Sequence, residues 1–345
     1  MNAPSKLSTG EQARKRRSLI VLLTLSVLII IVFFISLNAG SSRMSYEDVF
    51  QTLFGSGTEK QELILFQFRL PRIIISLLIG AGLAVSGVLL QGISRNPLAD
   101  PGILGINGGA GMMVMLYIFS FQSIATSSTM VLPAIALIGS SLAAFIIYTL
   151  SYEKHTGIVP IRMLYTGIAI SAAFSAAMIV IALKLSPEKY QQVASWLAGS
   201  IGNSNWKQVV ALLPWIVIII PLVYFKARTL DVLSLADHSA ISLGASVNKH
   251  QLLLLAAAVG LAGPSVAVSG SIGFVGLIAP HLARRLVGSG HRILIPTSAL
   301  AGSLLVIAAD TIGRSIIQPS EIPTGVVVAV IGAPYFLYLL AKTRA

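Results

Sequence analysis

The sequence contains no cysteine, which excludes a disulfide framework, thiolate metal sites and a cysteine nucleophile. Charged residues are also scarce, at 10% of the chain, whereas they make up about 25% of a soluble globular domain. Because 55% of the residues are hydrophobic, the chain has too little polar surface to cover itself in water. A soluble enzyme and a disordered protein are therefore excluded, and the composition indicates a protein embedded in lipid.

Motifs for nucleotide binding and for hydrolysis are missing as well. The sequence has no Gly-x-x-x-x-Gly-Lys-Ser/Thr loop, no His-Glu-x-x-His zinc motif and no Gly-x-Ser-x-Gly elbow. Its five histidines are scattered, so no metal site is predicted. The apolar stretches hold few ionisable residues, Asp310 being the main exception, whereas ion-coupled transporters usually keep such groups at mid-depth. We therefore expect neither catalysis nor a resident cofactor, and uphill transport would draw its energy from a partner.

Long apolar runs predict an all-α polytopic membrane protein with about ten transmembrane helices. We expect a basic tail over residues 1–18, one membrane domain over 19–341 and a short tail over 342–345. The first apolar run exceeds the core of a signal peptide, which takes about 7 to 15 residues, so we expect an uncleaved helix. The predicted helices are 19–38, 64–91, 103–121, 131–151, 161–184, 207–226, 250–268, 274–287, 293–313 and 324–341.

The distribution of basic residues predicts the orientation of these helices. With ten spans and the N-terminus inside, 16 of the 24 Lys and Arg residues lie on the inner side, as expected for cytoplasmic loops. This asymmetry accounts for the net charge of +12 without a nucleic-acid partner. Both termini are therefore predicted to be cytoplasmic.

A short echo links the second and seventh predicted helices. Ala84-Val85-Ser86-Gly87 recurs as Ala267-Val268-Ser269-Gly270. Because an odd number of helices separates the two copies, matching halves would be inverted in the membrane, as in many transporters. The general enrichment of small residues at helix contacts in lipid explains the echo equally well.

Three arginines lie at the predicted outer face. Arg69 and Arg72 flank Pro71 at the start of the second helix, and Arg314 follows the ninth helix. Such side chains often anchor a helix by reaching lipid headgroups. Alternatively, they form a receptor for carboxylates, because the planar guanidinium binds a carboxylate through two hydrogen bonds.

Two inner segments also have distinctive patterns. The loop from Arg95 to Gly105 contains two prolines and two glycines, which indicates either a tight connector or a rigid gate. The segment 227–249 is too polar to span the membrane and too patterned for a flexible linker. Capping residues within it predict a pair of short amphipathic helices, which a peripheral partner would bind.

Together with Gly276-Leu277-Ile278-Ala279-Pro280-His281 and Glu321-Ile322-Pro323-Thr324-Gly325, these blocks resemble a family of permeases. They are similar to the permease subunits of the FecCD-like family, type II ABC importers for iron–siderophore, haem and cobalamin complexes. The resemblance covers about residues 60–341, with the Arg-Leu-Pro-Arg, Asn-Pro-Leu-Ala-Asp-Pro-Gly and Gly-Leu-Ile-Ala-Pro-His blocks in the family's order. It implies ten helices per subunit, two permease subunits around a central path, ATPase subunits in the cytoplasm and an external solute-binding protein.

The resemblance also implies roles for particular residues. Arg69, Arg72 and Arg314 match arginines that receive acidic residues of the binding protein. Asn96 and Leu98 match one half of the family's cytoplasmic gate. Pro160 and Ile161 stand at the other half, where cobalamin permeases carry small hydroxylated residues. The segment 227–249 matches the coupling segment that contacts the ATPase, with Ala236, Leu243 and Gly244 as the contact residues.

Two blocks bear on the substrate: Arg95 to Asp100 and Gly105-Ile106-Asn107 look more like the iron–siderophore members than the cobalamin members. The resemblance thus implies a multi-pass permease of the bacterial plasma membrane, without ATPase activity of its own, that moves an iron–siderophore complex inward. Haem or cobalamin import is the alternative, and an ion-coupled secondary transporter is an alternative from another class. The second permease subunit is a copy of this chain or a paralogue.

Overall fold

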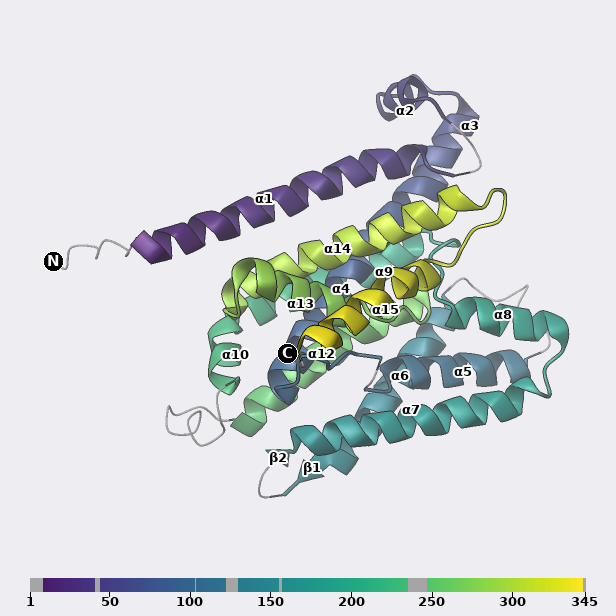
Figure 1. The fold of residues 1–345 in the computed structure, drawn as a ribbon. Helices are drawn as coiled ribbons and strands as arrows, with labels where there is room; N and C mark the ends of the chain where they lie inside the picture. Colours follow the sequence, from purple (N-terminus) through teal and green to yellow (C-terminus); the bar gives the residue numbers. More distant parts are fainter. Residues whose placement is uncertain are drawn as a thin grey trace.

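The computed structural model describes residues 9–40, 44–102, 104–121, 130–154, 157–234 and 247–343. These residues form a helical bundle (Figure 1). The β structure found among them is a two-residue ladder that pairs β1 (Tyr152–Glu153) with β2 (Gly157–Ile158) in antiparallel fashion. The predicted all-α fold class is therefore confirmed.

Each of the ten predicted transmembrane helices has a counterpart among the described residues. Seven helical stretches there are long and apolar enough to cross a membrane, and Ile106–Ser120 and Thr324–Tyr338 are shorter apolar helices. The counterparts are α1 (Thr9–Asn38), α4 (Leu70–Ser94), α5 (Ile106–Ser120), α6 (Val131–Ser151), α7 (Pro160–Ala182), α9 (Trp206–Phe225), α12 (Val247–Ser269), α13 (Val275–Val287), α14 (His291–Ile316) and α15 (Thr324–Thr343).

Helix α1 and the continuous helical stretch Glu59–Ser94, which contains α4, both begin earlier than predicted. Helix α1 starts at Thr9 instead of residue 19, because the Gln, Lys and Arg residues before the apolar run favour helix as well. The second helix is preceded by α3 (Glu59–Glu62) and a π-helical segment η1 (Leu63–Arg69). Pro71 lies two residues after the end of η1 and has no N–H to donate, so the hydrogen-bond ladder is interrupted where the wider turn forms.

Two further helices were not predicted, because they are short and polar. Helix α2 (Tyr46–Leu53) begins with a capping box formed by Ser45 and Asp48, and α8 (Pro187–Leu197) is capped by Ser186. Both signals are readable in the sequence. A helix is also found at the start of the predicted inner segment, namely α10 (Ala227–Leu233). The second predicted inner helix falls in residues 235–246, which lie outside the described residues.

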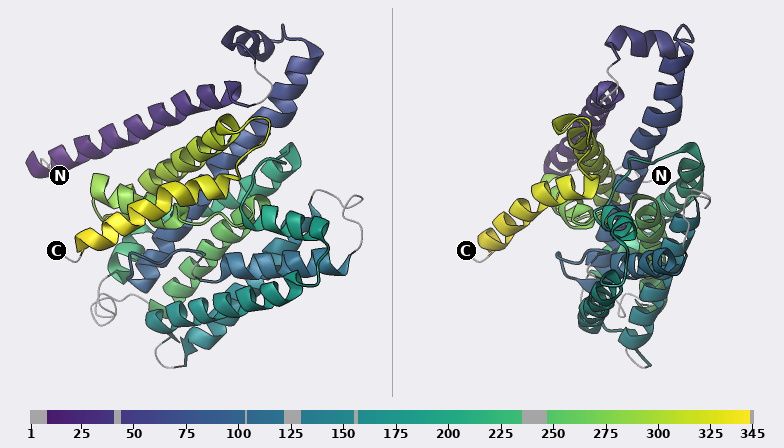
Figure 2. Two further views of the ribbon diagram at one scale, coloured as in Figure 1. Left: turned by 45° about the vertical axis from the view of Figure 1, so that its right-hand side comes forward. Right: turned by 90° about the vertical axis from the view of Figure 1, so that its right-hand side faces the viewer.

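Glycines allow the central helices to approach closely. Helix α4 is buried along most of its length, and α14, α12 and α13 pack against it (Figures 1 and 2). A Cβ atom on Gly80 would collide with the backbone carbonyl of Gly302 on α14, and one on Gly87 would collide with that of Gly276. Close contact between small residues is a usual way for helices to associate in lipid. The two helices with the sequence echo, α4 and α12, are neighbours, but the inverted repeat stays a prediction.

The bundle has two distinct ends. The start of α1, the end of α15 and α10 lie at one end, whereas α2, α3 and α8 lie at the other (Figures 1 and 2). The predicted orientation places the first end in the cytoplasm and the second outside, so we name them the inner end and the outer end. The predicted site residues divide between them.

Candidate functional site

At the outer end, a buried carboxylate joins two of the three predicted arginines. Arg72 donates from Nε and Nη2 to Asp310 Oδ1, at 3.0 and 2.9 Å. Arg314 Nε lies 3.1 Å from Asp310 Oδ2, and the Thr324 hydroxyl donates to Oδ1 at 3.1 Å. Arg72 also donates from Nη1 to Glu321 Oε2 at 2.8 Å. The cluster thus ties α4 to α14 and to the start of α15.

The other contacts of the arginines hold the end of α1. Arg69 donates to the carbonyl oxygen of Leu37, and Arg314 donates to that of Ala39 at 3.1 Å and to the Ser36 hydroxyl at 2.5 Å. The last carbonyls of a helix have no partners within it, and positive charge is favourable there. The two arginines therefore cap the C-terminus of α1.

Burial distinguishes this cluster from a charged rim. Arg69, Arg72, Arg314 and Asp310 are 5%, 8%, 4% and 1% exposed, so the arginines do not reach out to headgroups from this conformation. Three arginines and two carboxylates leave one net positive charge. The structure brings all three predicted arginines to one place, and their role in docking a binding protein stays a prediction.

Two partners of the arginines were missed in the sequence. Asp310 was noted as the exceptional carboxylate of an apolar stretch, and an ionisable group within a membrane helix normally has a charged partner. That rule alone points to an arginine on a neighbouring helix. Glu321, whose side chain is 42% exposed, carries no comparable signal, because a loop carboxylate needs no partner.

Beside the cluster lies a hollow of about 660 Å³, between α8 and the neighbouring ends of α5, α6, α9 and α12. A Cβ atom on Gly202, in the adjoining loop, would lie 3.6 Å from Glu321 Oε2, so hollow and cluster adjoin. Side chains with amides and hydroxyls share its lining: Gln191, Gln192, Ser195, Ser200, Asn203 and Gln208. These groups can hydrogen-bond a polar solute at the outer end.

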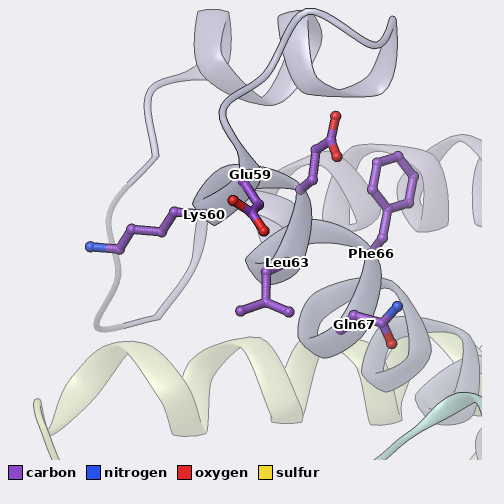
Figure 3. Close-up of a pocket in the computed structure, with 6 residues that line it drawn as sticks. Glu59, Lys60, Leu63, Phe66 and Gln67 are labelled. Atoms are coloured by element: carbon purple, nitrogen blue, oxygen red, sulfur yellow. The ribbon is translucent and has the colours of Figure 1, made fainter.

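A separate shallow hollow of about 500 Å³ lies on α3 and η1. Figure 3 shows that Glu59 and Lys60 line it together with Leu63, Phe66 and Gln67. Glu59 and Lys60 are exposed charged residues on the short helix α3. This hollow contains no buried polar group of the kind that defines a binding site.

At the inner end, the predicted gate loop is held by its own hydrogen bonds. Arg95 ends α4 in the left-handed conformation, with φ of 51°. The side chain of Asn96 accepts from the Leu98 N–H at 2.9 Å, and that of Asp100 accepts from the Gly102 N–H at 2.7 Å. Asn96 and Leu98 are half-buried. These two hydrogen bonds hold the described part of the loop, while its gating role stays a prediction.

The second half of the predicted gate lies at the start of α7. Pro160 is the first residue of that helix and is half-buried, and Ile161 follows it with 58% exposure. Helix α7 buries little of its apolar surface within the chain. The coupling residues predicted on the same side, Ala236, Leu243 and Gly244, lie outside the described residues.

The apolar helices of the described residues define a multi-pass membrane protein. The chain belongs to the FecCD transport family, whose model matches residues 28–342. It is 48% identical over 337 residues to the iron(3+)-hydroxamate import system permease protein FhuG of Bacillus subtilis (strain 168), covering 96% of this chain and 100% of the relative. It is 39% identical over 324 residues to the hemin transport system permease protein HmuU of Yersinia pestis, covering 93% and 95%.

A solved structure has the same fold. It is described as an inward-facing conformation of a metal-chelate type ABC transporter, with a TM-score of 0.81 and 32% sequence identity over 93% of this chain and 99% of that one. The predicted family and fold class are confirmed by these matches.

Proposed function

We propose that this chain is the permease subunit of an ATP-driven importer that moves an iron–siderophore complex into the cytoplasm. The main support is the similarity, over nearly the full length of the chain, to permeases of iron-chelate import. The sequence identity is 48% to an iron(3+)-hydroxamate permease and 42% to an Fe(3+)-citrate permease. A ferric hydroxamate is the favoured substrate class, and haem is the second candidate because of the hemin permease relative.

The energy source follows from the pairing of the membrane carboxylate. Asp310 is paired with two arginines and accepts a hydrogen bond from a hydroxyl. Because its carboxylate already has these partners, we do not expect it to bind and release a proton or cation during transport. We therefore propose that a separate ATPase binds at the inner end, where α10 lies (Figure 1). A second permease subunit, a copy or a paralogue, completes the path, and an external binding protein docks at the outer end.

Uptake of labelled iron tests the substrate and the energy source. Deleting the gene is expected to reduce uptake from a ferric hydroxamate siderophore to background, while use of haem and cobalamin is unchanged. In proteoliposomes holding the complete complex, uptake is expected to require internal ATP and to persist with a protonophore. Uptake that follows the proton gradient and ignores ATP would instead establish the secondary transporter.

The predicted sidedness has a direct test, because the chain has no native cysteine. Lys15→Cys and Lys342→Cys, both at exposed positions, are expected to resist a membrane-impermeant thiol reagent in intact spheroplasts and to react after permeabilisation. Lys60→Cys on α3 is the matched control and is expected to react in both. Ready labelling of Lys15→Cys in intact spheroplasts would reverse the topology.

The docking role of the arginines is best tested through Glu321, the exposed member of the cluster. If Arg72 receives a carboxylate from the binding protein, Glu321 competes for the same Nη1 atom. Glu321→Gln is then expected to tighten docking a few-fold, within the range of less than about 1 kcal/mol for an exposed ion pair. High salt should reduce the gain. Equal affinity of mutant and wild type for the binding protein at low salt would argue against docking at Arg72.

A further inference from the structure

One face of the short helix α2 fixes it to the outer end of the bundle. Val49 and Thr52 on this face are 4% and 1% exposed. Val49 packs in a small apolar cluster with Leu37 at the end of α1 and Leu65 in η1. The turn after α2 folds back over Thr52, because a Cβ atom on Gly57 would collide with that side chain. Helix α2 therefore has a defined orientation relative to the spanning helices.

A second face of α2 is apolar, large and uncovered by any described residue. Tyr46, Phe50 and Phe54 are 63%, 59% and 76% exposed, and Leu53 is 38% exposed. The rings of Phe50 and Phe54 lie against each other, with their centroids 5.3 Å apart. Spacings of three and four residues put these side chains on one stripe of the helix. A contiguous exposed apolar patch of this kind marks a contact with a protein or a membrane.

The remaining face of α2 is polar. Glu47 and Gln51 are exposed, and the Gln51 amide donates to the Glu47 carboxylate at 3.4 Å. Each residue advances about 100° around an α-helix, so Gln51 lies off the stripe that contains Phe50. The circumference of α2 is thus divided among a bundle-facing sector, an aromatic sector and a polar sector. A helix that lies in the membrane interface beside a protein needs these three sectors, because it meets protein, lipid and water.

Helix α2 lies next to two segments that expose apolar surface. It contacts α1 and α3, and the right-hand view of Figure 2, which looks onto the outer end, shows α2 at the margin of the bundle beside α1. In the last turns of α1, Phe34 and Ile35 are 46% and 47% exposed. In η1, Leu63 and Phe68 are 52% and 60% exposed. Apolar surface on spanning helices faces lipid, so α2 lies where lipid reaches the outer end.

We propose that α2 is an interfacial helix whose aromatic sector, formed by Tyr46, Phe50, Leu53 and Phe54, lies in the outer leaflet of the bilayer. Aromatic side chains are enriched at the level of the headgroups, and an interfacial helix buries its apolar face about 5–10 Å into this region. The sequence of α2 contains two acidic residues and no Lys or Arg. Apolar burial, and not attraction to anionic headgroups, therefore holds the helix there. This inference does not depend on the transported solute.

The external binding protein and a second permease subunit are the other candidate occupants of the aromatic sector. The binding protein is predicted to bring acidic residues to the arginine cluster, whereas α2 offers aromatic rings and two further acidic side chains, which do not attract them. A protein on this face would shield the rings from water and from lipid alike, whereas the bilayer would shield them from water alone. The two cases can therefore be separated by measuring access from each side.

The test uses the full-length permease in bilayers of phosphatidylethanolamine and phosphatidylglycerol, with and without the external binding protein. Because the chain has no native cysteine, a nitroxide spin label can be attached at one introduced cysteine. Its collisions are measured with oxygen, which concentrates in lipid, and with a nickel chelate, which stays in water. The oxygen-to-nickel ratio at Phe50→Cys is expected to be several-fold higher than at Gln51→Cys, the matched control on the polar sector.

Two further positions calibrate the ratio. Ile30→Cys, at a 55% exposed position within α1, is the lipid reference, and Lys60→Cys on α3 is the water reference. Phe54→Cys covers the case in which Phe50→Cys does not fold, because Phe54 follows the end of α2. The same high ratio is expected at this position.

Equal ratios at the aromatic positions and at Gln51→Cys would overturn the proposal, since the two sectors would then lie in the same medium. Protection of the Phe50→Cys label from both oxygen and nickel, in either preparation, would show that a protein covers the face and would overturn it as well. Neither solute nor ATP takes part in the measurement, so a failure of the proposed function leaves its outcome unchanged.

Discussion

Asp310→Ala is expected to prevent the permease from accumulating in folded form. The change leaves Arg72 and Arg314 more than nine-tenths buried without the carboxylate that they share. Removing one partner of a buried ion pair costs about 3–5 kcal/mol, a large share of the roughly 5–15 kcal/mol by which a folded domain is stable. The measurement is the amount of detergent-extracted permease that elutes as a single peak, together with its thermal unfolding midpoint.

Glu321→Gln is the matched control for this prediction. It removes the other carboxylate that binds Arg72, but this side chain is 42% exposed, so the expected cost is below about 1 kcal/mol. Accumulation of Asp310→Ala at the level of Glu321→Gln would show that the buried charges do not stabilise the fold.

The same geometry makes Arg72→Glu unsuitable as a test of docking. It would place a third carboxylate beside Asp310 and Glu321, so a loss of function would report on folding and not on docking.

Gly80→Val is expected to separate α4 from α14 and to abolish uptake. A Cβ atom at this position would meet the carbonyl group of Gly302 and the Cα of Ser303, which are backbone atoms and cannot rotate away. Overpacking of this kind costs about 1–3 kcal/mol, occasionally more. Because α4 and α14 carry the arginine cluster at one end and pack against α10 at the other, a small displacement affects both. Thermal unfolding and ATP-driven uptake are the two measurements.

Gly273→Val serves as the control, because an added Cβ at Gly273 meets no atom within 4 Å. It is expected to unfold near the wild-type temperature. Equal midpoints for Gly80→Val and Gly273→Val would mean that the close contact between α4 and α14 does not hold the bundle together.

The sequence by itself determined the membrane class, about ten membrane-spanning helices and most of their bounds. The thickness of the bilayer requires about 20 apolar residues for each span, so a local run of residues is enough to place a helix. The predicted 131–151 and 207–226 agree with α6 (Val131–Ser151) and α9 (Trp206–Phe225) within a residue. The short blocks, such as Arg-Leu-Pro-Arg and Gly-Leu-Ile-Ala-Pro-His, were enough to predict the family, because each block is a run of consecutive residues. Helices α2 and α8 were missed, because their signals are single caps and not long periodic runs.

Only the tertiary structure decided what the charged residues do. Arg72 and Asp310 are 238 positions apart, and Asp231 and His291 are 60 apart, so no local pattern links them. The first pair meets because α4 and α14 pack side by side, which the contact at Gly80 and Gly302 makes possible. The second pair meets because α10 packs against α14. In a membrane helix a buried charge needs a partner, and this rule states that a partner exists without naming it. The packing of the helices selects the partner. The three arginines that were predicted at the outer face therefore lie in a buried cluster.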